Sequence, residues 1–348
     1  MTKKKLFVIG HFGFGKDLLN GQTVKTRILT DELIKQLGDD EVICVDTHGS
    51  RLKLIRTLLS LFSIAKRTRN AVMLPAHNGV KVLTPMFLQL RRMYGIKLHY
   101  VVIGGWLSDM VKQDRSLCAR LKKFDGIYVE TNTMKRSLEA QGFENIFVMP
   151  NCKHLKALSE DKLVYSNDLP LKLCTFSRVM KEKGICEAVS AVKKINSDRG
   201  RTVYTLDIYG QIDSSQTEWF DKLLLELPEC VKYRGLVDYD KSIDTLKDYF
   251  ALLFPTKFYT EGIPGTIIDA YCAGIPVLSA KWESYSDIIK ENETGYCFEF
   301  DNYDDFVKIL DGMSDNVDAF NKMKPACLKE GRRFDPMTVV GEFINQLS

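Results

Sequence analysis

The segment Phe254–Leu278 combines two carboxylates with the predicted start of a helix, an arrangement that can bind a phosphorylated ligand. Free N–H groups and the dipole of a helix N-terminus favour an anion. The residues at this helix start are Gly262, Ile263, Pro264, Gly265 and Thr266, and we expect the proline at the first helical position. Glu261 precedes the helix and Asp269 lies in its second turn, where both can accept hydrogen bonds from sugar hydroxyls. Both carboxylates would also be stabilised by the positive end of the helix dipole if no ligand bound there. These residues alone therefore leave two interpretations open.

A second loop carries two cations that suit the same kind of ligand. Arg178 and Lys183 follow the apolar run Leu171–Ser177. The planar guanidinium of arginine binds paired phosphate oxygens, and lysine supplies a point charge. Cations in loops are commonly only solvated. The prediction that Arg178 and Lys183 bind phosphate therefore requires their loop to lie beside the segment around Glu261.

Glycine-rich loops follow two apolar runs in the first half of the chain. The first loop contains Gly13, Gly15, Gly21 and Gln22. The second contains Gly104, Gly105, Trp106 and Asp109, which we expect to shape a pocket for a second substrate. Glycine lets the backbone approach a ligand closely, but the first loop lacks the G-x-G-x-x-G spacing of nicotinamide-binding proteins.

Short apolar runs alternate with helical patterns along the whole chain. The first half contains the predicted strands Leu6–Gly10, Glu41–Thr47, Ala71–Ala76, Lys97–Gly104, Gly126–Glu130 and Ile146–Pro150. The second half contains Leu171–Ser177, Val203–Gly210, Val231–Gly235, Ala251–Pro255, Pro276–Ala280 and Gly295–Phe300. Such alternation predicts an α/β fold whose parallel sheets are covered on both faces.

A polar stretch between the two sets of strands predicts two Rossmann-like domains. We place the domains at residues 1–155 and 171–325, the linker at 156–170 and a C-terminal helical segment at 326–348. Ligands of open parallel sheets bind beyond the carboxyl ends of the strands, so we expect both sheets to face a central cleft.

The segment around Glu261 is similar to the signature of retaining GT-B glycosyltransferases of family 4, also called glycosyltransferase group 1. That signature is E-G-x-P, a second acidic residue and then A-G-x-P-V. The matching residues are Glu261, Gly262, Pro264, Asp269, Gly274, Pro276 and Val277, although the family usually has glutamate at the position of Asp269. The loop after Leu171–Ser177 resembles the family's G-R-x-x-x-x-K-G element, with Ser177 in place of the first glycine.

This resemblance implies transfer of a sugar, with retention, from a nucleoside diphosphate sugar, with a uridine donor favoured and neither metal nor cofactor required. It implies that Glu261 is catalytic and contacts the donor sugar, that Asp269 contacts the ribose, and that Arg178 and Lys183 bind the diphosphate together with the helix start. The first glycine loop would line the junction of donor and acceptor.

No general base is assigned from the sequence. Many members of the resembled family have a histidine after the fourth strand, but the loop Ile103–Asp109 has none. His99 lies inside a predicted strand, where we expect it to fill the core. The leaving phosphate can instead take the proton of the acceptor.

The charge of the chain is distributed unevenly. Residues 1–150 have a net charge of +11 and residues 151–348 of −7. The span from Thr47 to Ser108 has ten basic residues and no acidic one, and it includes the basic amphipathic pattern Arg51–Arg67. We therefore expect the first domain to dock on an anionic membrane surface. A lipid-linked glycan acceptor for capsule or lipopolysaccharide synthesis would fit, with the protein cytoplasmic and peripheral to the inner face of the membrane.

Other functions remain open at this stage. A nucleotide-sugar 2-epimerase of the same fold would need catalytic acids and a histidine that we cannot place. A sugar-binding transport protein would need a secretion signal, and none is recognised. A nucleic-acid partner is not expected, because aromatic residues are not interleaved with the basic ones. Nine scattered cysteines without a C-x-x-C pair indicate reduced thiols.

Overall fold

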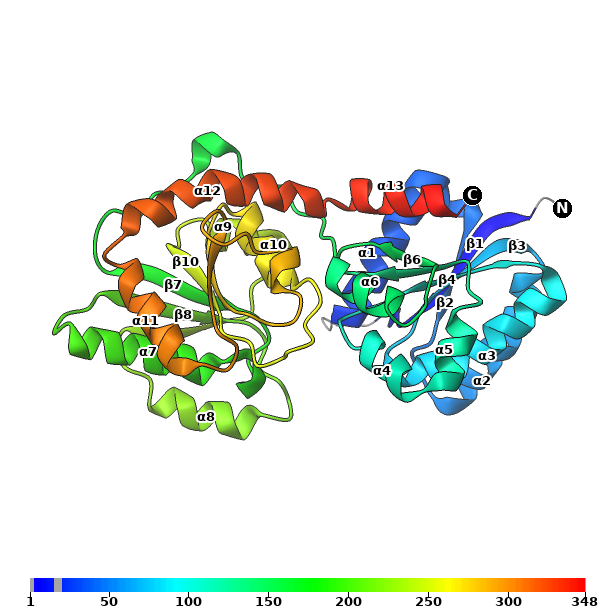
Figure 1. The fold of residues 1–348 in the computed structure, drawn as a ribbon, viewed down its shortest axis with the longest axis horizontal. Coiled ribbons are helices and arrows are strands. Elements are labelled where there is room, and N and C mark those ends of the chain that lie inside the picture. Colours follow the sequence, from blue (N-terminus) through cyan, green and yellow to red (C-terminus); the bar gives the residue numbers. More distant parts are fainter. Residues whose placement is uncertain (1–2, 16–20, 348) are drawn as a thin grey trace. The chain divides into compact units, whose positions relative to one another are not determined.

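The computed structural model describes residues 3–15 and 21–347, apart from the side chains of residues 51–53. The chain divides into two compact units. Unit 1 contains Met1–His154 and Phe334–Ser348, and unit 2 contains Leu155–Arg333. Each unit is built on a parallel sheet of six strands with helices on both faces (Figure 1). The α/β fold with two parallel sheets is therefore confirmed.

Unit 1 has the strand order β2-β1-β3-β4-β5-β6. Its strands are β1 (Lys4–Gly10), β2 (Val42–Asp46), β3 (Thr68–Leu74), β4 (Lys97–Val101), β5 (Gly126–Val129) and β6 (Ile146–Val148). Its helices are α1 (Gly21–Leu37), α2 (Arg51–Ala65), α3 (His77–Tyr94), α4 (Leu107–Gln113), α5 (Arg115–Leu121), α6 (Asn132–Glu139) and α13 (Pro336–Gln346).

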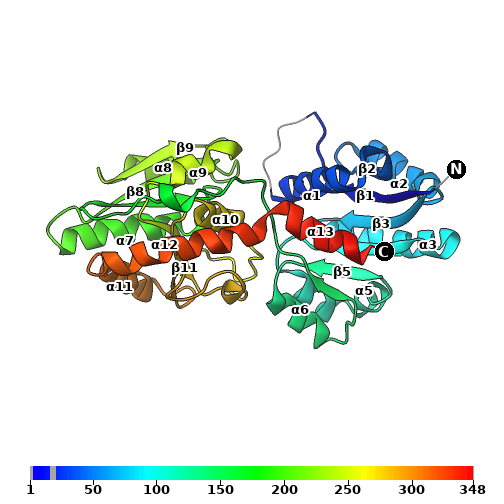
Figure 2. The same cartoon turned by 90° about the horizontal axis from the view of Figure 1, so that it is seen from above.

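The sheet of unit 1 is buried on both faces because most positions of its strands are apolar. In β1, Phe7 and Ile9 point into the core under α2 to α6. Leu6 and Val8 point into the opposite core, under α1 and α13. Figure 2 shows α13 beside α1, in agreement with the contacts between them.

Unit 2 has the strand order β12-β11-β10-β7-β8-β9. Its strands are β7 (Leu171–Phe176), β8 (Tyr204–Tyr209), β9 (Val231–Gly235), β10 (Ala251–Phe254), β11 (Val277–Ala280) and β12 (Gly295–Phe298). Its helices are α7 (Ile185–Asp198), α8 (Thr217–Leu225), α9 (Ser242–Leu246), α10 (Gly265–Cys272), α11 (Tyr303–Met313) and α12 (Val317–Gly331).

The chain reverses direction across each sheet at one point. In unit 2 the order of the strands reverses between β7 and β10, and in unit 1 it reverses between β1 and β3. Helices leave to opposite faces at such a switch point, so the loops at the carboxyl ends of the two strands diverge and leave room for a ligand.

The two ends of unit 2 differ from the sequence-based boundaries. The proposed linker 156–170 lies against unit 2, where the N–H of Leu158 donates to the carbonyl of Cys272 and the N–H of Ser166 donates to Asn321. The proposed segment 326–348 is divided, because α12 ends in unit 2 whereas α13 packs in unit 1. Val340 and Phe343 of α13 complete the core over α1, which stabilises this return of the chain.

Candidate functional site

The switch point of unit 2 brings the loops after β7 and β10 together. These strands are hydrogen-bonded neighbours, and the N–H of Lys257 in one loop donates to the carbonyl of Glu182 in the other at 2.8 Å. Gly184 allows this approach. It has a φ of +70°, and a Cβ atom there would lie 2.0 Å from the carbonyl oxygen of Pro255. A residue other than glycine would therefore push the two loops apart.

The structure joins two of the predicted site residues directly. Lys183 Nζ forms an ion pair with Glu261 Oε1, and the two side chains are only 16% and 17% exposed. The hydroxyl of Thr256 donates to the same carboxylate oxygen at 3.2 Å. Lys183 Nζ also lies 4.9 Å from the ring centre of Phe258. A cation and a carboxylate are thus held together, half-buried, at the edge of the sheet where ligands bind.

A pocket of about 380 Å³ lies at the end of β10, and its lining includes Thr256 but neither Lys183 nor Glu261. Pro255, Thr256 and Lys257 contribute one part of its wall, and Asp301 to Tyr303 contribute another.

Arg178 comes from the same loop as Lys183 but has a different partner. Its Nη1 lies 3.3 Å from Asp213 Oδ2, and its side chain is 46% exposed. Hydrogen bonds from Ser215 lower the pKa of Asp213, which keeps this carboxylate charged beside the arginine. Arg178 is thus available at the surface of the loop and is not paired with Glu261.

Helix α10 begins one residue later than expected. Pro264 is its N-cap, with an extended ψ of 125°, and the helix starts at Gly265. The reason is local, since the carbonyl of Pro264 already accepts the N–H groups of Ile267 and Ile268. Thr266 Oγ1 in the first turn is buried and has no hydrogen-bond partner among the described residues. Gly262 and Ile263 are buried beside it.

Asp269 lies in α10 with only 2% of its surface exposed. It is therefore buried in this structure, whereas Glu261 is half-buried at the helix start. Its contact with a ribose stays a prediction.

The first glycine loop of unit 1 is anchored by a carboxylate. Asp46 accepts hydrogen bonds from the backbone N–H groups of Phe12, Gly13 and Phe14 at 3.0 to 3.2 Å. Gly13 and Gly15 have φ values of +58° and +77°, which explains why glycine is needed there. Residues 16–20 of the loop lie outside the described part of the chain.

The other end of this loop reaches the switch point of unit 1. Gly21 begins α1, and the side chain of Gln22 donates to the carbonyl of Leu74 at the end of β3 at 3.4 Å. The predicted loop residues thus surround the carboxyl ends of β1 and β3.

A buried ion pair holds the loop after β4 in place. Lys25 Nζ and Glu130 Oε1 lie 2.5 Å apart and are each 5% exposed. The N–H of Gly104 donates to the same Glu130 oxygen at 3.4 Å. Gly105 follows in a bend, and the indole of Trp106 donates to the carbonyl of Ile103 at 2.8 Å. This loop is therefore held in a defined position at the edge of the sheet.

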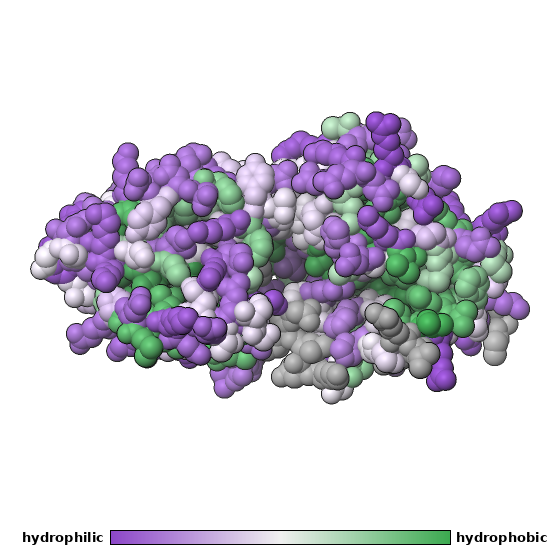
Figure 3. Space-filling model, turned by 90° about the horizontal axis from the view of Figure 1, so that it is seen from below, coloured by the Kyte–Doolittle hydropathy of each residue, from purple (hydrophilic) through white to green (hydrophobic). Residues whose placement is uncertain are grey.

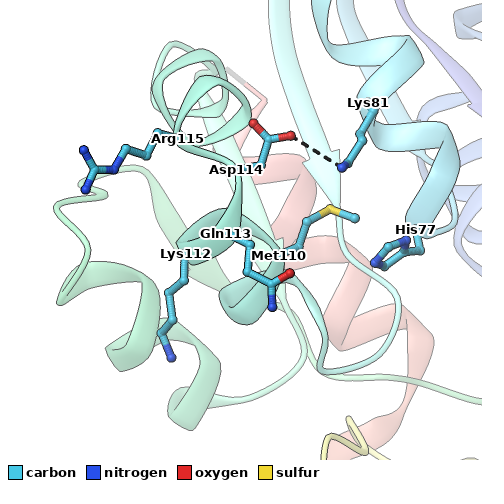
Figure 4. A pocket seen from close by; sticks show the side chains of 7 residues that line it. All are labelled: His77, Lys81, Met110, Lys112, Gln113, Asp114 and Arg115. Carbon is cyan, nitrogen blue, oxygen red and sulfur yellow. Dashed lines mark ion pairs between the residues drawn. The ribbon is translucent and has the colours of Figure 1, made fainter.

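Trp106 lies next to a residue that lines a pocket in unit 1. Its ring lies 5.0 Å from that of His77, one of the residues lining a pocket of about 620 Å³. The other lining residues are Lys81, Met110, Lys112, Gln113, Asp114 and Arg115 (Figure 4). Asp109, on α4, forms an ion pair with Lys112 at 3.2 Å. The sequence indicated Trp106 and Asp109 but not the basic residues, which come from α3, α4 and α5.

Two further polar residues have structural roles. His99 is fully buried and contacts Tyr128 and Asn70 at 3.1 and 3.2 Å. Burial lowers the pKa of His99 to about 4, so it is neutral. Its predicted core role is confirmed. Asp238 precedes a short helical turn but does not cap it through its side chain, which pairs with Lys241.

Sequence reasoning missed a row of hydrogen-bonded side chains in unit 1. His11 Nδ1 lies 2.7 Å from the hydroxyl of Thr23, and His11 Nε2 lies 3.0 Å from His48 Nδ1. The two histidines are 37 positions apart in the sequence, and only the pairing of β1 with β2 brings them together. No local motif could have indicated this contact.

No group of three or more histidine, cysteine, aspartate or glutamate side chains is arranged to hold a metal ion in residues 3–15 and 21–347. In the same residues, no helix is both long and apolar enough to span a membrane.

Comparison with known proteins relates most of unit 2 to a protein family. Residues 164–329 match the sequence model of the family Glycosyl transferases group 1. The amylovoran biosynthesis glycosyltransferase AmsK of Erwinia amylovora is 26% identical over 132 residues. That alignment covers 36% of this chain and 32% of AmsK, so the match spans about a third of the curated relative.

Solved structures resemble the whole chain. Anabaena HepE, in complex with UDP and glucose, superimposes with a TM-score of 0.74 at 12% identity and covers 99% of both chains. The lipopolysaccharide outer core galactosyltransferase WaaB, in its apo form, gives 0.71 at 17% identity with the same coverage. At these identities the likeness shows the fold alone. The chain has the GT-B fold, and its residues 164–329 form a glycosyltransferase group 1 domain.

Proposed function

We propose that this protein is a retaining glycosyltransferase that takes a sugar from a nucleoside diphosphate sugar bound by unit 2. The observation that carries the proposal is the half-buried pair of Lys183 and Glu261. This pair lies at the switch point of a sheet and within the group 1 glycosyltransferase domain. A carboxylate held beside a cation can face a sugar while the cation faces the phosphate that leaves.

The donor diphosphate would lie between the loop after β7 and the start of α10. Lys183 and Arg178 supply charge, and the first N–H groups of α10 supply hydrogen bonds. Thr266 Oγ1 has no partner among the described residues and adds a further hydrogen-bonding group in this turn. Asp269 would bind the ribose. A uridine donor is favoured, since HepE was solved with UDP and with UDP-glucose.

Unit 1 would bind the acceptor, which we propose to be a lipid-linked glycan in bacterial surface polysaccharide synthesis. The glycine loops around β1 and β4 and the open pocket beside Trp106 provide the surface. The names of two similar proteins support the acceptor class, since one belongs to amylovoran biosynthesis and the other to the lipopolysaccharide outer core.

A thermal-shift panel tests the donor assignment. Nucleoside diphosphates and their sugars should raise the melting temperature of the protein, whereas bare nucleosides and NAD should not. A ligand at 100 times its Kd stabilises the folded state by roughly 2.7 kcal/mol, which is readily measured. If NAD stabilised the protein and no sugar nucleotide did, the donor assignment would be wrong.

We further propose that unit 1 docks on an anionic membrane through α2 and α3. The apolar face predicted on α2 mostly packs inward, since Leu61 and Ala65 belong to the core and Leu58 packs against it. Ile55 and Leu59, one turn apart, are instead 55% and 66% exposed. Figure 3 shows apolar side chains gathered on this face of unit 1.

Exposed basic side chains lie on the same helix and just beyond its end. Arg56 lies between Ile55 and Leu59, and Lys66 and Arg69 are exposed just beyond the helix. The side chains of Arg51 and Lys53, which also belong to the predicted basic helix, lie outside the described part of the structure. Insertion of a few apolar groups together with attraction to anionic lipid is the physics of reversible peripheral binding.

Liposome co-sedimentation tests the docking. The wild type should bind anionic vesicles at low salt and be released at high salt, because each basic residue near the lipid contributes about 1 kcal/mol that salt screens. The double variant Ile55→Glu/Leu59→Glu should bind roughly tenfold more weakly, since it removes apolar area and adds like charge. Leu225→Glu is the matched control, because Leu225 is 88% exposed in unit 2. Binding that ignores salt, or an equal loss in the control, would refute this docking surface.

A further inference from the structure

The pocket of about 620 Å³ in unit 1 is built by three helices. Its lining comes from the start of α3, the end of α4 and the start of α5. Figure 4 shows His77 and Lys81 pointing from α3 toward Met110 and Asp114. All of these elements belong to unit 1, so the pocket needs no contribution from unit 2. It is large enough for a small molecule, since ligand pockets measure roughly 300–1,000 Å³.

Cations dominate the lining of this pocket. Lys81, Lys112 and Arg115 contribute their positive charges, and Asp114 is the one carboxylate among the lining residues that the structure describes. Arg115 is exposed and has neither a hydrogen-bond nor an ion-pair partner in the described part of the chain. Helix α3 begins at His77, so the positive end of its dipole also lies at the pocket. The pocket therefore favours an anionic ligand.

The ion pairs that the two lysines make are weak. Lys81 Nζ lies 3.5 Å from Asp114 Oδ2, and Lys112 Nζ lies 3.2 Å from Asp109 on its own helix. Three of these four side chains are more than half exposed. Exposed ion pairs contribute little to stability, because water screens the charges and long side chains lose freedom when they pair. Both lysines can therefore turn to a ligand at small cost.

Asp114 has a second role that keeps it in place. Its Oδ1 accepts the N–H of Leu117 at 2.9 Å and so caps the start of α5. This hydrogen bond lowers the pKa of Asp114, which keeps the carboxylate charged. Asp114 thus fixes the helix start that carries Arg115 and orients Lys81 toward the pocket.

The kind of anion follows from the cations and their surroundings. A guanidinium binds paired phosphate oxygens, and an ammonium group adds a point charge. Three cations suit a group with more than one negative charge, as phosphate and diphosphate esters have. Met110 adds an apolar wall to the pocket. Val82, which follows Lys81 on α3, is 56% exposed, so the same helix offers an apolar side chain to a lipid.

We propose that this pocket binds the diphosphate group that joins a lipid to its glycan. The proposal rests on the lipid-linked acceptor proposed above, and adds that unit 1 recognises this acceptor through its diphosphate and not through its sugars alone. Lys81 and Arg115 contact the phosphate oxygens, and Lys112 adds charge at the rim. A free glycan without the diphosphate is then a poor acceptor.

Vesicle co-sedimentation tests the pocket without any transfer reaction. Phosphatidylcholine vesicles contain either a polyprenyl diphosphate or phosphatidylglycerol, at the same surface charge. The wild type should bind the diphosphate vesicles at least ~10-fold more tightly, because hydrogen bonds to charged groups are strong. The double variant Lys81→Gln/Arg115→Gln should lose this preference and keep the melting temperature of the wild type, since both side chains are exposed.

Two control proteins locate the effect. Arg120→Gln/Lys123→Gln removes the same charge from exposed positions near the other end of α5 and should keep the preference. Lys183→Met changes the proposed donor site of unit 2 and should keep it as well. A preference that survives in Lys81→Gln/Arg115→Gln, or that is lost equally in either control, would overturn the pocket assignment.

Inorganic pyrophosphate separates a lipid ligand from a free one. In excess it should release the wild type from the diphosphate vesicles, because it carries the same group. If the wild type instead bound pyrophosphate through this pocket but showed no preference between the two kinds of vesicle, the lipid assignment would be wrong.

A transfer assay separates this inference from the proposed function. Lys81→Gln/Arg115→Gln should raise the KM for a lipid-linked acceptor at least ~10-fold and leave the Kd of the nucleoside diphosphate unchanged. An unchanged KM would contradict the role of the pocket in acceptor recognition. A wild type that prefers the diphosphate vesicles but transfers no sugar would refute the proposed function and not the pocket.

Discussion

Replacing Glu261 by glutamine is expected to lower kcat for sugar transfer by at least ~100-fold, as is typical when a group that stabilises the transition state is lost. Glutamine has the same size and can still accept the hydrogen bond from Thr256. It has no charge, however, and can neither pair with Lys183 nor stabilise positive charge that develops on the sugar. Initial rates of nucleoside diphosphate release at saturating donor measure the effect.

Glu299→Gln is the matched control for this substitution. Glu299 forms an ion pair with Lys281 in the same unit, and its side chain is 65% exposed. This control should keep its rate and its melting temperature. A Glu261→Gln protein that folds normally and turns over at nearly the wild-type rate would remove Glu261 from the catalytic machinery.

Lys183→Met is expected to weaken the binding of nucleoside diphosphate by roughly 10- to 100-fold, because a hydrogen bond to a charged group contributes about 1.5–3 kcal/mol. Methionine keeps the apolar stem against the ring of Phe258 but removes the ammonium group. Arg178→Ala should show a loss of the same kind. Calorimetric titration with the nucleoside diphosphate and with the bare nucleoside measures both affinities.

The contrast between the two ligands decides this prediction. The bare nucleoside has no phosphate, so its affinity should be nearly the same in the variants and the wild type. Lys281→Met, which removes a lysine paired with Glu299 outside the site, serves as the control. Equal losses for nucleoside and diphosphate would mean that Lys183 and Arg178 do not contact the phosphates.

Most of the fold could be predicted from the chain because its signals are local. All twelve strands are present, and their ends differ from the expected ones by at most three residues. The spacing of Ile28, Leu29 and Leu33 indicates one face of a helix, and α1 places all three side chains in the core. The path of α13 was not predictable in this way, since its apolar face indicates a packed helix but not the unit that it covers.

The site was predictable where a motif names its residues and not where a contact joins distant segments. The segment around Glu261 and the cation Lys183 were both indicated, but their direct pairing depends on strands 78 positions apart meeting at a switch point. The contact of His11 with His48 and the support of Gly104 by Glu130 arise in the same manner. Such contacts follow from tertiary packing, which a single sequence does not encode at any one place.

Product analysis of the wild-type reaction tests the central claim most directly. The protein is incubated with the sugar nucleotide that raises its melting temperature most, together with free and lipid-linked glycan acceptors, and all products are identified by mass spectrometry and NMR. We predict nucleoside diphosphate and, in equal amount, an acceptor heavier by one sugar with the anomeric configuration of the donor. Donor returned as its 2-epimer without release of nucleoside diphosphate, or donor returned unchanged with every acceptor, would contradict glycosyl transfer.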